Sequence, residues 1–559
     1  MDPAVGDQYC GLPYELSNFQ GFFDCDNGVK IGRPKTIAEL QAMVTMFPKA
    51  KASGMGASFN KEFFCSGNDT ESINIVMTEL TSTLDFITRN PKPADYANTT
   101  IIADFPIQVD EDMQTVTVAA GVPQRMLLDW LADYRYWEQP AGWILPAQSW
   151  FIDQTIGGAV ATNTHGSSMQ HGSLSSQVVG LKVVLANGTL LEVSPKINRH
   201  LWRAMGVSVG RLGIITEVTM RIKPQMAVEK KATKPSYDEW VAQIRQTQED
   251  YKGAKAAGDV AGMKRALSQV DEMQTFWHVP LQNMWRADFE YLNKEPLAVN
   301  LNIDTSAPQD PLVKAMSGPG DDVFTQLHKA AVPVRPTLAN NARYWANYYA
   351  TMGQQYVVPG TYEASKAYLS MTEQGVRLTA GWAGYDQYEV SIPMEIAADC
   401  MAEVGAEIYG PKALWNGFRT PGLIRFVPGE EFYLSNTNGG PRMYINLEDY
   451  VSHQTGRTNK EFLEVIKIFR ERCNARLHWG KAGWVQLGEK PFDGAAEYPE
   501  TWCHFGCAVS SLDPHTKFAS QSNAWWWGAT RDGKSVPFDS CCTPSGFSAQ
   551  CKCAKRPAA

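Results

Sequence analysis

The stretch 156–224 constrains the fold of this 559-residue chain most, because it combines a glycine-rich segment with closely spaced strand patterns. Gly157 and Gly158 open it, and Gly166 is followed by two serines. Small residues let the backbone come close to a bulky ligand, because a larger side chain would fill that space. The stretch therefore predicts a close backbone contact with a large ligand. Tight turns in an ordinary α/β domain are the alternative explanation of a Gly-Gly pair.

The second half of this stretch predicts paired strands. Apolar residues alternate over 178–185, an Asn187-Gly188 turn follows, and the alternation resumes over 189–193. An Asn-Gly pair between two such runs is typical of a β-hairpin. A further strand, interrupted by glycine, is expected over 210–219.

Length and composition exclude several classes of protein. A chain of 559 residues is too long for one core, so two or more domains are expected. The net charge of −8, with no basic stripe, argues against a nucleic-acid partner. No run of about 18 apolar residues is present, so no transmembrane span is expected. The 17 Trp and 21 Tyr residues fit a chain that encloses a ring system or a sugar, and they fit a large aromatic core equally well.

The 11 cysteines gather near the two ends of the chain, which predicts ends held by disulfides and an oxidising compartment. An odd number leaves at least one cysteine free or paired elsewhere. Zinc is the alternative for the C-terminal cysteines, but their Cys-Cys and Cys-x-Cys spacings do not match the usual paired ligands, so no metal is expected. The terminal cysteines are Cys10, Cys25, Cys65, Cys503, Cys507, Cys541, Cys542, Cys551 and Cys553, whereas Cys400 and Cys473 lie alone.

The compartment stays open at this point. Sequons at Asn68, Asn98 and Asn187 are compatible with secretion, as are the cysteines. The first residues lack the basic and apolar segments of a signal peptide, which argues the other way.

The N-terminal part predicts a helix and then an anion-binding loop. A strand pattern stops at Pro34, and Thr36 followed by Glu39 is typical of a helix N-terminus. Residues 53–58 are mostly small, and backbone N–H groups in such a loop bind anions without a basic side chain.

These elements, in this order, resemble the PCMH-type FAD-binding domain of the vanillyl-alcohol-oxidase superfamily. Within it the chain resembles the aldonolactone oxidase family, in its L-gulonolactone oxidase-like, plant-type branch. The sharpest match outside the flavin domain is His478-Trp479-Gly480-Lys481. The resemblance implies an α+β fold, with a two-subdomain FAD-binding domain and an α+β substrate (cap) domain. It implies an N-terminal extension at 1–29, the FAD-binding domain at 30–224, the substrate domain at 225–485, a segment at 486–527 that returns to close the flavin pocket with a helix over 512–518, and a Cys-rich tail at 528–559.

The resemblance also implies how FAD is held. The family loop reads Gly-x-Gly-His-Ser, and its histidine often carries the flavin covalently. Ala57 stands at that position, and a methyl group cannot make the bond, so non-covalent FAD is expected, with a flavin linked to Cys65 as the alternative. The residues expected to contact FAD are Ser53, Gly54, Met55, Gly56, Ala57, Ser58, Gly157, Gly158, Ala161, Thr162, Thr164, His165, Gly166, Ser167, Gly213, Ile214, Ile215 and Lys481.

The expected catalytic residues are Arg425, Lys481 and His478. By resemblance, Arg425 and Lys481 would bring positive charge to the flavin, which becomes anionic on reduction. The family strand carries Glu-x-Arg, and here Leu423 replaces the glutamate. Possible hydroxyl partners are Glu389, His478 and Tyr444, among which geometry must decide.

The resemblance implies an FAD-dependent oxidoreductase acting on a CH–OH group of an aldono-1,4-lactone, such as an L-gulono-, L-galactono- or D-arabinono-lactone. Molecular oxygen would be the acceptor, giving hydrogen peroxide and a product leading towards ascorbate or an analogue. The alternatives are a dehydrogenase of the same fold with another acceptor and an alditol or polyol oxidase. A non-catalytic, secreted flavin- or sugar-binding protein is also kept open, by Leu423. Asn163, where relatives often have glycine, is a candidate for controlling oxygen access.

Overall fold

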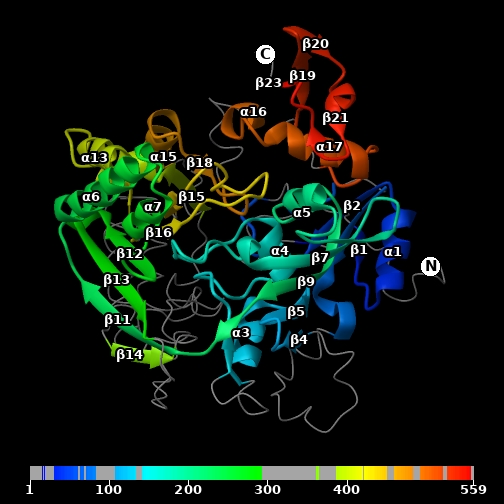
Figure 1. Ribbon diagram of the computed structural model, residues 1–559, viewed down its shortest axis with the longest axis horizontal. Helices are drawn as coiled ribbons and strands as arrows, with labels where there is room; N and C mark the ends of the chain where they lie inside the picture. Colours follow the sequence, from blue (N-terminus) through cyan, green and yellow to red (C-terminus); the bar gives the residue numbers. More distant parts are fainter. Residues whose placement is uncertain are drawn as a thin grey trace, which may run out of the picture.

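A computed structural model describes residues 16, 18, 25, 30–60, 63–67, 71–82, 107–133, 142–292, 360–363, 386–418, 421–449, 459–482, 492–519 and 525–555. Two large sheets dominate these ranges and lie side by side in Figure 1. One has five strands in the order β4-β5-β9-β7-β8, and the other has eight in the order β14-β11-β13-β12-β16-β17-β15-β18. Helices cover both, so the predicted α+β class is confirmed.

A small parallel sheet with one helix forms the N-terminal subdomain. Its elements are β1 (Lys30–Gly32), α1 (Ile37–Met46), β2 (Lys49–Ser53) and β3 (Ser72–Val76), with β3 in the middle. The predicted helix start is confirmed, because Thr36 accepts from the Glu39 N–H and Glu39 accepts in return from the Thr36 N–H. Since β2 ends at Ser53, the sheet delivers residues 53–58 to the centre of the molecule.

The five-stranded sheet is antiparallel throughout and contains the predicted hairpin. Gly188 in its turn has φ +81°, a conformation that favours glycine. The strands are β4 (Ile107–Asp110), β5 (Thr115–Ala119), β7 (Val178–Val184), β8 (Leu190–Val193) and β9 (Ile214–Arg221). The helices beside it are α3 (Gln124–Asp133), α4 (Ile156–Ala161) and α5 (Arg199–Met205), and β6 (Trp143–Ile144) pairs with β10 (Lys223–Pro224).

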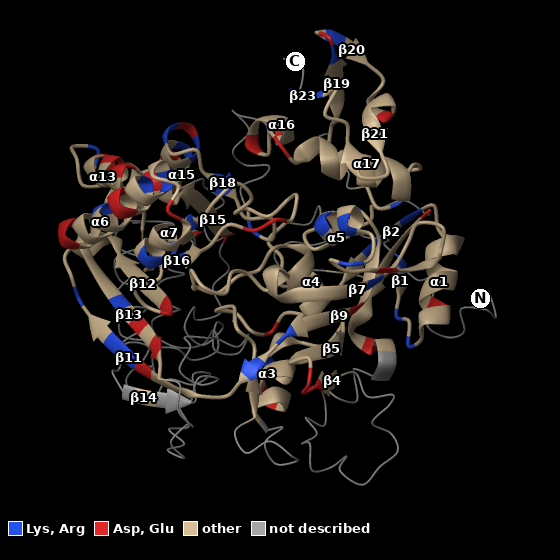
Figure 2. Ribbon diagram, viewed as in Figure 1, with Lys and Arg blue, Asp and Glu red and all other residues tan. Residues whose placement is uncertain are grey.

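Helices cover the outer face of the eight-stranded sheet, and they carry many of the charged residues on that side of the molecule (Figure 2). The strands are β11 (Ala227–Thr233), β12 (Glu272–His278), β13 (Asn283–Tyr291), β14 (Gly360–Glu363), β15 (Asp386–Pro393), β16 (Gly422–Val427), β17 (Arg442–Asp449) and β18 (Arg476–Leu477). The helices are α6 (Tyr237–Ala256), α7 (Val260–Leu267), α13 (Ala397–Ile408) and α15 (Lys460–Arg472). The other face of β15–β17 turns toward α4, so the central strands contribute side chains to the space between the two sheets.

The C-terminal module is held by disulfides. Cys503–Cys553 and Cys507–Cys542 join it to α17 (Trp502–Leu512), and Cys541–Cys551 lies within it. Its elements are β19 (Gly528–Arg531), β20 (Lys534–Val536), β21 (Cys542–Thr543), β22 (Gly546–Phe547) and β23 (Lys552–Ala554), and the short helix α16 (Gly494–Glu497) precedes α17. Every cysteine in the described ranges is disulfide-bonded, which leaves none of them as a zinc ligand.

Two further disulfides refine the prediction from the sequence. Cys25–Cys65 ties the N-terminal segment to the loop after β2, so Cys65 has no thiol for a flavin link. Cys400 and Cys473, for which the sequence suggested no partners, form a disulfide that joins α13 to the end of α15. Cys10 lies outside the described residues, as do the sequons at Asn68 and Asn98, whereas Asn187 lies exposed in the β7–β8 turn.

The helix predicted over 512–518 is wrong in position. Helix α17 ends at Leu512, where that helix was expected to begin, and the following residues form turns. Asp513 accepts hydrogen bonds from the N–H groups of Lys517 and Phe518, which folds the chain back on itself. None of the helices in the described ranges combines the length and apolar character that a membrane crossing requires.

Candidate active site

A cavity with an empty volume of about 1090 Å³ lies between residues 53–58, α4 and the eight-stranded sheet. Its lining residues are Ala52, Ser53, Gly54, Met55, Gly56, Ala57, Ser58, Phe59, Phe63, Phe64, Ser149, Trp150, Phe151, Gln154, Thr155, Gly158, Ala159, Thr162, Thr164, His165, Gln387, Glu389, Leu423, Arg425, Asn446, His478, Gly480 and Lys481.

The loop at 53–58 forms one wall, and its predicted contact with FAD stays a prediction. Gly56 has φ +68°. A Cβ on Gly54 would lie 2.1 Å from Oγ1 of Thr155, so only glycine fits there. The Phe59 N–H donates to the Gly480 carbonyl oxygen at 2.9 Å, which fixes the loop against the segment that carries Lys481.

The glycine-rich stretch contributes part of the opposite wall. Gly158, Thr162, Thr164 and His165 line the cavity. The other residues predicted there do not line the cavity. A Cβ on Gly157 would lie 2.7 Å from Cβ of Ala120, which shows close packing at that position. The residues outside the lining are Gly157, Ala161, Gly166, Ser167, Gly213, Ile214 and Ile215, and their contact with a cofactor stays a prediction.

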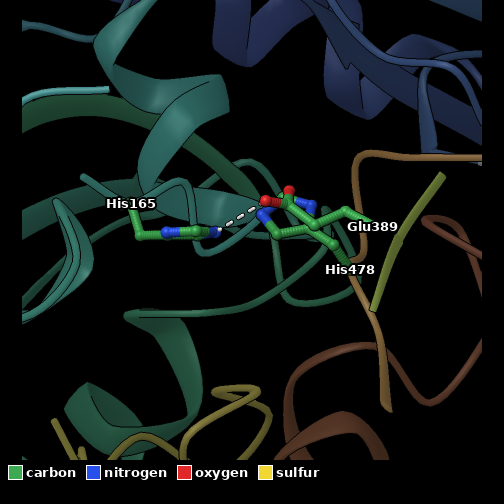
Figure 3. Close-up of side chains that lie close together, drawn as sticks. All are labelled: His165, Glu389 and His478. Atoms are coloured by element: carbon green, nitrogen blue, oxygen red, sulfur yellow. Dashed lines mark ion pairs between the residues drawn. The ribbon is translucent and has the colours of Figure 1, made fainter. Parts of the chain in front are cut away.

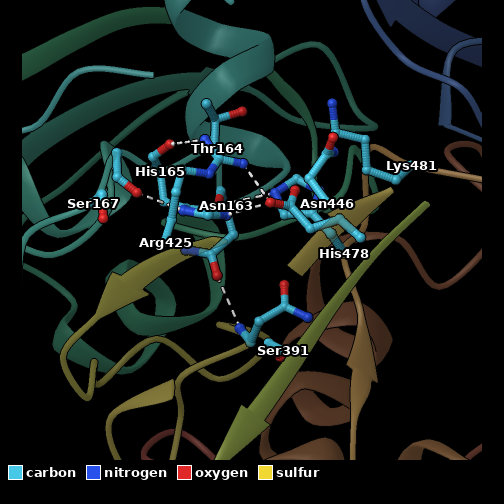
Figure 4. A network of polar contacts seen from close by, with 12 residues as sticks. Asn163, Thr164, His165, Ser167, Ser391, Arg425, Asn446, His478 and Lys481 are labelled. Carbon is cyan, nitrogen blue, oxygen red and sulfur yellow. Dashed lines mark hydrogen bonds and ion pairs between the residues drawn. The ribbon is translucent and has the colours of Figure 1, made fainter. Parts of the chain in front are cut away.

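The eight-stranded sheet supplies the ionised side chains. Asn446 on β17 lies directly opposite Leu423 on β16 and Glu389 on β15. Directly opposed residues in antiparallel strands share a face, so these three form one row facing the cavity. Arg425, two residues along β16, donates to Oε1 of Glu389 and, at 3.0 Å, to the His165 carbonyl oxygen. Figure 4 shows this polar network.

Lys481 ends this face of the cavity and donates to Oε1 of Gln387 on β15. Burial lowers the pKa of Lys481 to about 8, and the Arg425 charge acts in the same direction while Glu389 opposes it. Burial alone would raise the pKa of Glu389, but the Arg425 charge holds it well below its usual range. The carboxylate is therefore ionised, and the site carries two cations around one anion at neutral pH.

His478 lies in the cavity wall with both ring nitrogens used by the backbone. Its Nε2 lies 3.3 Å from the Asn163 carbonyl oxygen, and its Nδ1 accepts from the Gly480 N–H at 3.1 Å. Burial lowers its pKa to about 3. His478 is therefore a neutral group that joins two loops. Neither of its ring nitrogens is free to contact a substrate, as its predicted catalytic role would require.

Asn163 turns away from the cavity. Its side chain donates to Ser173 and Glu430 and accepts from the Asn436 N–H, and its φ of +60° is one that glycine also adopts readily. It therefore anchors the loop after β16. Because Asn163 does not line the cavity, its side chain is not positioned to control oxygen access.

His165, Glu389 and His478 lie close enough to hold a metal ion, with candidate ligand atoms within 4.8 Å of one another (Figure 3). The Arg425 guanidinium already neutralises the Glu389 carboxylate. A metal cation placed there would be repelled by Arg425, so we assign this group to a hydrogen-bonded polar network.

The sequence missed the polar strand positions of this site. Gln387 and Asn446 were not predicted, and Glu389 was named only as one of several hydroxyl partners. The available signal was the strand β15 itself, where Gln387 and Glu389 alternate within a run that is buried almost throughout. A charged residue in such a strand is uncommon unless it is paired, and it therefore marks a polar site.

Comparison with known proteins agrees with this arrangement. Residues 101–194 match the model of an FAD binding domain, and residues 383–526 match that of D-arabinono-1,4-lactone oxidase. L-Gulonolactone oxidase of Bos taurus is 35% identical over 124 residues, 22% of this chain and 27% of that protein. D-Arabinono-1,4-lactone oxidase of Yarrowia lipolytica is 45% identical over 76 residues, 14% of each chain. The chain thus spans about a quarter or less of the length of these curated relatives.

A solved structure extends the similarity to almost the whole chain. Cholesterol oxidase from Brevibacterium sterolicum superimposes with a TM-score of 0.64 at 15% identity, covering 93% of this chain and 98% of that one. This likeness shows the fold alone, a PCMH-type FAD-binding fold with a second α+β domain, and confirms the predicted architecture. The plant-type branch stays a prediction. The chain therefore carries matches to an FAD binding domain and to a D-arabinono-1,4-lactone oxidase domain, and the curated proteins it is similar to are aldonolactone oxidases.

Proposed function

We propose that this protein is an FAD-dependent oxidoreductase that oxidises a CH–OH group of an aldono-1,4-lactone, passes the electrons to molecular oxygen and forms hydrogen peroxide. One observation carries the proposal: a single cavity unites a loop built for close backbone contact with Glu389 and Arg425 on a sheet face and with Lys481 beside that face. The named relatives support a lactone as the substrate.

The residues around the cavity fit FAD. Residues 53–58 and the N-terminal part of α4 would hold it, because both line the cavity and Gly54 lets the loop pack closely against Thr155 at the start of α4. When bound, the flavin supplies the hydride acceptor. Ala57 supports non-covalent binding, since its methyl group cannot form the bond that a histidine makes at this position.

The side chains of the sheet fit the rest of the reaction. Arg425 and Lys481 place positive charge where negative charge develops, and one preorganised donor of this kind contributes about 10²–10³-fold in rate. Gln387, Glu389 and Asn446 offer hydrogen-bonding groups for the hydroxyls of a lactone, which also suits a polyol. The presence of Glu389 at this face speaks against a non-catalytic binding protein.

We also propose that the domain boundary lies near residue 224. The five-stranded sheet ends at Arg221 and the eight-stranded sheet begins at Ala227, which agrees with an FAD-binding domain at 30–224 and a substrate domain at 225–485. In its described part, the segment at 486–527 does not line the cavity, and many of its side chains are buried in the core around the five-stranded sheet.

The test is optical. The purified protein is precipitated with acid, and a fresh sample is mixed anaerobically with L-gulono-, L-galactono- or D-arabinono-1,4-lactone. We expect yellow colour in the supernatant, bleaching by a lactone, and recovery in air with hydrogen peroxide formed. Colour retained in the pellet would refute non-covalent binding. Bleaching that air does not reverse would identify a dehydrogenase, and bleaching by alditols alone would replace the lactone as substrate.

A further inference from the structure

We propose that His165 is the group that accepts the proton of the substrate hydroxyl, and that Glu389 positions it and stabilises its protonated form. This inference rests on the proposed function, because it assigns a role within that reaction. It gives this role to a residue that the sequence assigned to cofactor contact, whereas the sequence left the hydroxyl partner open among Glu389, His478 and Tyr444.

The hydrogen bond at Nδ1 fixes the tautomer of His165. Nδ1 lies 2.8 Å from the Gly166 carbonyl oxygen, which can only accept, so Nδ1 carries a hydrogen. In a neutral imidazole the other nitrogen, Nε2, then has a lone pair. Burial and the charge of Arg425 lower the pKa of His165, while Glu389 acts in the opposite direction, which agrees with a neutral ring before substrate binds.

Nε2 of His165 has no hydrogen-bond partner among the described residues. Nε2 lies 3.3 Å from Oε1 of Glu389, and both side chains are 1% exposed. An ionised carboxylate also only accepts, so two acceptors face each other. Within the described ranges, His165 Nε2 and Glu389 Oε2 are buried without a hydrogen-bond partner, and both residues line the cavity. A substrate hydroxyl is the kind of donor that this pair lacks.

His478 provides the contrast within the same cavity. Its Nε2 faces the Asn163 carbonyl oxygen and its Nδ1 accepts from the Gly480 N–H, so both nitrogens have backbone partners. Protonating Nδ1 would break the bond from Gly480. Protonating Nε2 of His165 breaks nothing and creates an ion pair with Glu389.

The step balances with the flavin as oxidant. The substrate O–H bond breaks and an N–H bond forms at Nε2 of His165. The hydrogen on the same carbon leaves with its electron pair to the bound flavin, and a C=O bond forms. The new imidazolium lies beside the Glu389 carboxylate, and the groups around the pair include Arg425, Lys481, His478 and the Tyr444 ring.

The tautomer is tested directly by ¹⁵N NMR of histidine ring nitrogens in the flavin-bound protein without substrate, with His165→Gln and His478→Gln for assignment. At pH 7 we expect hydrogen on Nδ1 and a free Nε2 at His165, and the opposite tautomer at His478. A hydrogen on Nε2 of His165, as the other tautomer or as imidazolium, would overturn the proposal whether or not any lactone is oxidised.

Variants test the role. His165→Gln should slow flavin reduction by lactone about 10²–10⁴-fold, the usual contribution of a general base, while lactone binding followed by thermal shift is kept. His165→Ala should be partly rescued by added imidazole, which a purely structural residue would not show. Glu389→Gln should lower the rate and move its pH profile, and His515→Gln, at an exposed histidine, is the control.

The outcomes separate the two proposals. If no lactone reduces the wild-type flavin, the proposed function fails and the NMR result still decides the tautomer. If the wild type is reduced and a folded His165→Gln, confirmed by its thermal transition, is reduced equally fast, only the role of His165 is refuted.

Discussion

The wall formed by residues 53–58 and the wall formed by β15–β17 face the same cavity but offer opposite kinds of groups. The first offers backbone and small side chains, and Gly54 and Gly56 are required by contact or by φ. The second offers Glu389 and Arg425 on β15 and β16, with Lys481 beside them in the segment after β18. Cofactor binding at the first wall depends on how small its side chains are. Catalysis at the second wall depends on the charges of its side chains. Substitutions at the two walls should therefore fail in different ways.

The largest effect is expected from Arg425→Met. Removing one partner of a buried ion pair leaves the other charge uncompensated and costs about 3–5 kcal/mol. Urea unfolding should show this loss, and adding Glu389→Gln should recover part of it. Arg199→Met, which removes an exposed pair with Glu431, should change stability by about 0–1 kcal/mol. Equal losses at both sites would contradict the arrangement.

Lys481→Met comes next and should affect rate more than binding. We expect flavin reduction by lactone to slow by about 10²–10³-fold, because a cation at the developing negative charge is lost. FAD should stay bound at the loop wall. Stopped-flow reduction measures the rate, and Lys252→Met on the outer face is the control. Loss of FAD together with rate would show that the two walls do not act separately.

Gly54→Ala should weaken FAD binding. The added Cβ meets Thr155 at 2.1 Å. Overpacking of this kind costs about 1–3 kcal/mol, which corresponds to a roughly 10–100-fold higher Kd. Gly253→Ala is a matched control, because its Cβ meets open space. Fluorescence titration of flavin-free protein with FAD compares the two, and equal affinities would refute the contact.

The smallest effect is the pH dependence of the wild type. Burial lowers the pKa of Lys481 to about 8, so its charge is present below that pH and is lost above it. The reduction rate should fall as pH rises above 8, and Lys481→Met should lack this limb. Stability should change in the opposite direction between pH 8 and 10.5, because there the unfolded chain binds the proton that the folded protein has lost. A rate that falls together with stability would point to unfolding instead.

Local features could be predicted from the sequence, because their signals lie within a few residues of one another. The Thr36–Glu39 cap, the Asn187-Gly188 hairpin and the loop at 53–58 all have this property. The position of α17 was not predicted: a helix was expected over 512–518, whereas α17 ends at Leu512. The resemblance set the expected position, and the apolar residues before Leu512 carried no clear signal for a helix end.

Contacts between distant segments could not be predicted in the same way. His165 and Glu389 are brought together only when the glycine-rich stretch packs against β15, and the Cys400–Cys473 pair depends on how α13 and α15 lie together. Residue type alone offered Glu389, His478 and Tyr444 as equals. The hydrogen bonds of each ring nitrogen, which only the folded chain defines, distinguish His165 from His478.

The two disulfides between α17 and the C-terminal module give the molecule a covalent loop. Cys503–Cys553 and Cys507–Cys542 both bridge the connection between Leu512 and Gly528. A protease that cuts this connection would leave the last residues attached, so the cleaved protein would migrate as one piece until a reductant is added. At this end of the protein, the pieces can therefore stay covalently joined by disulfides even after a peptide bond has been cut.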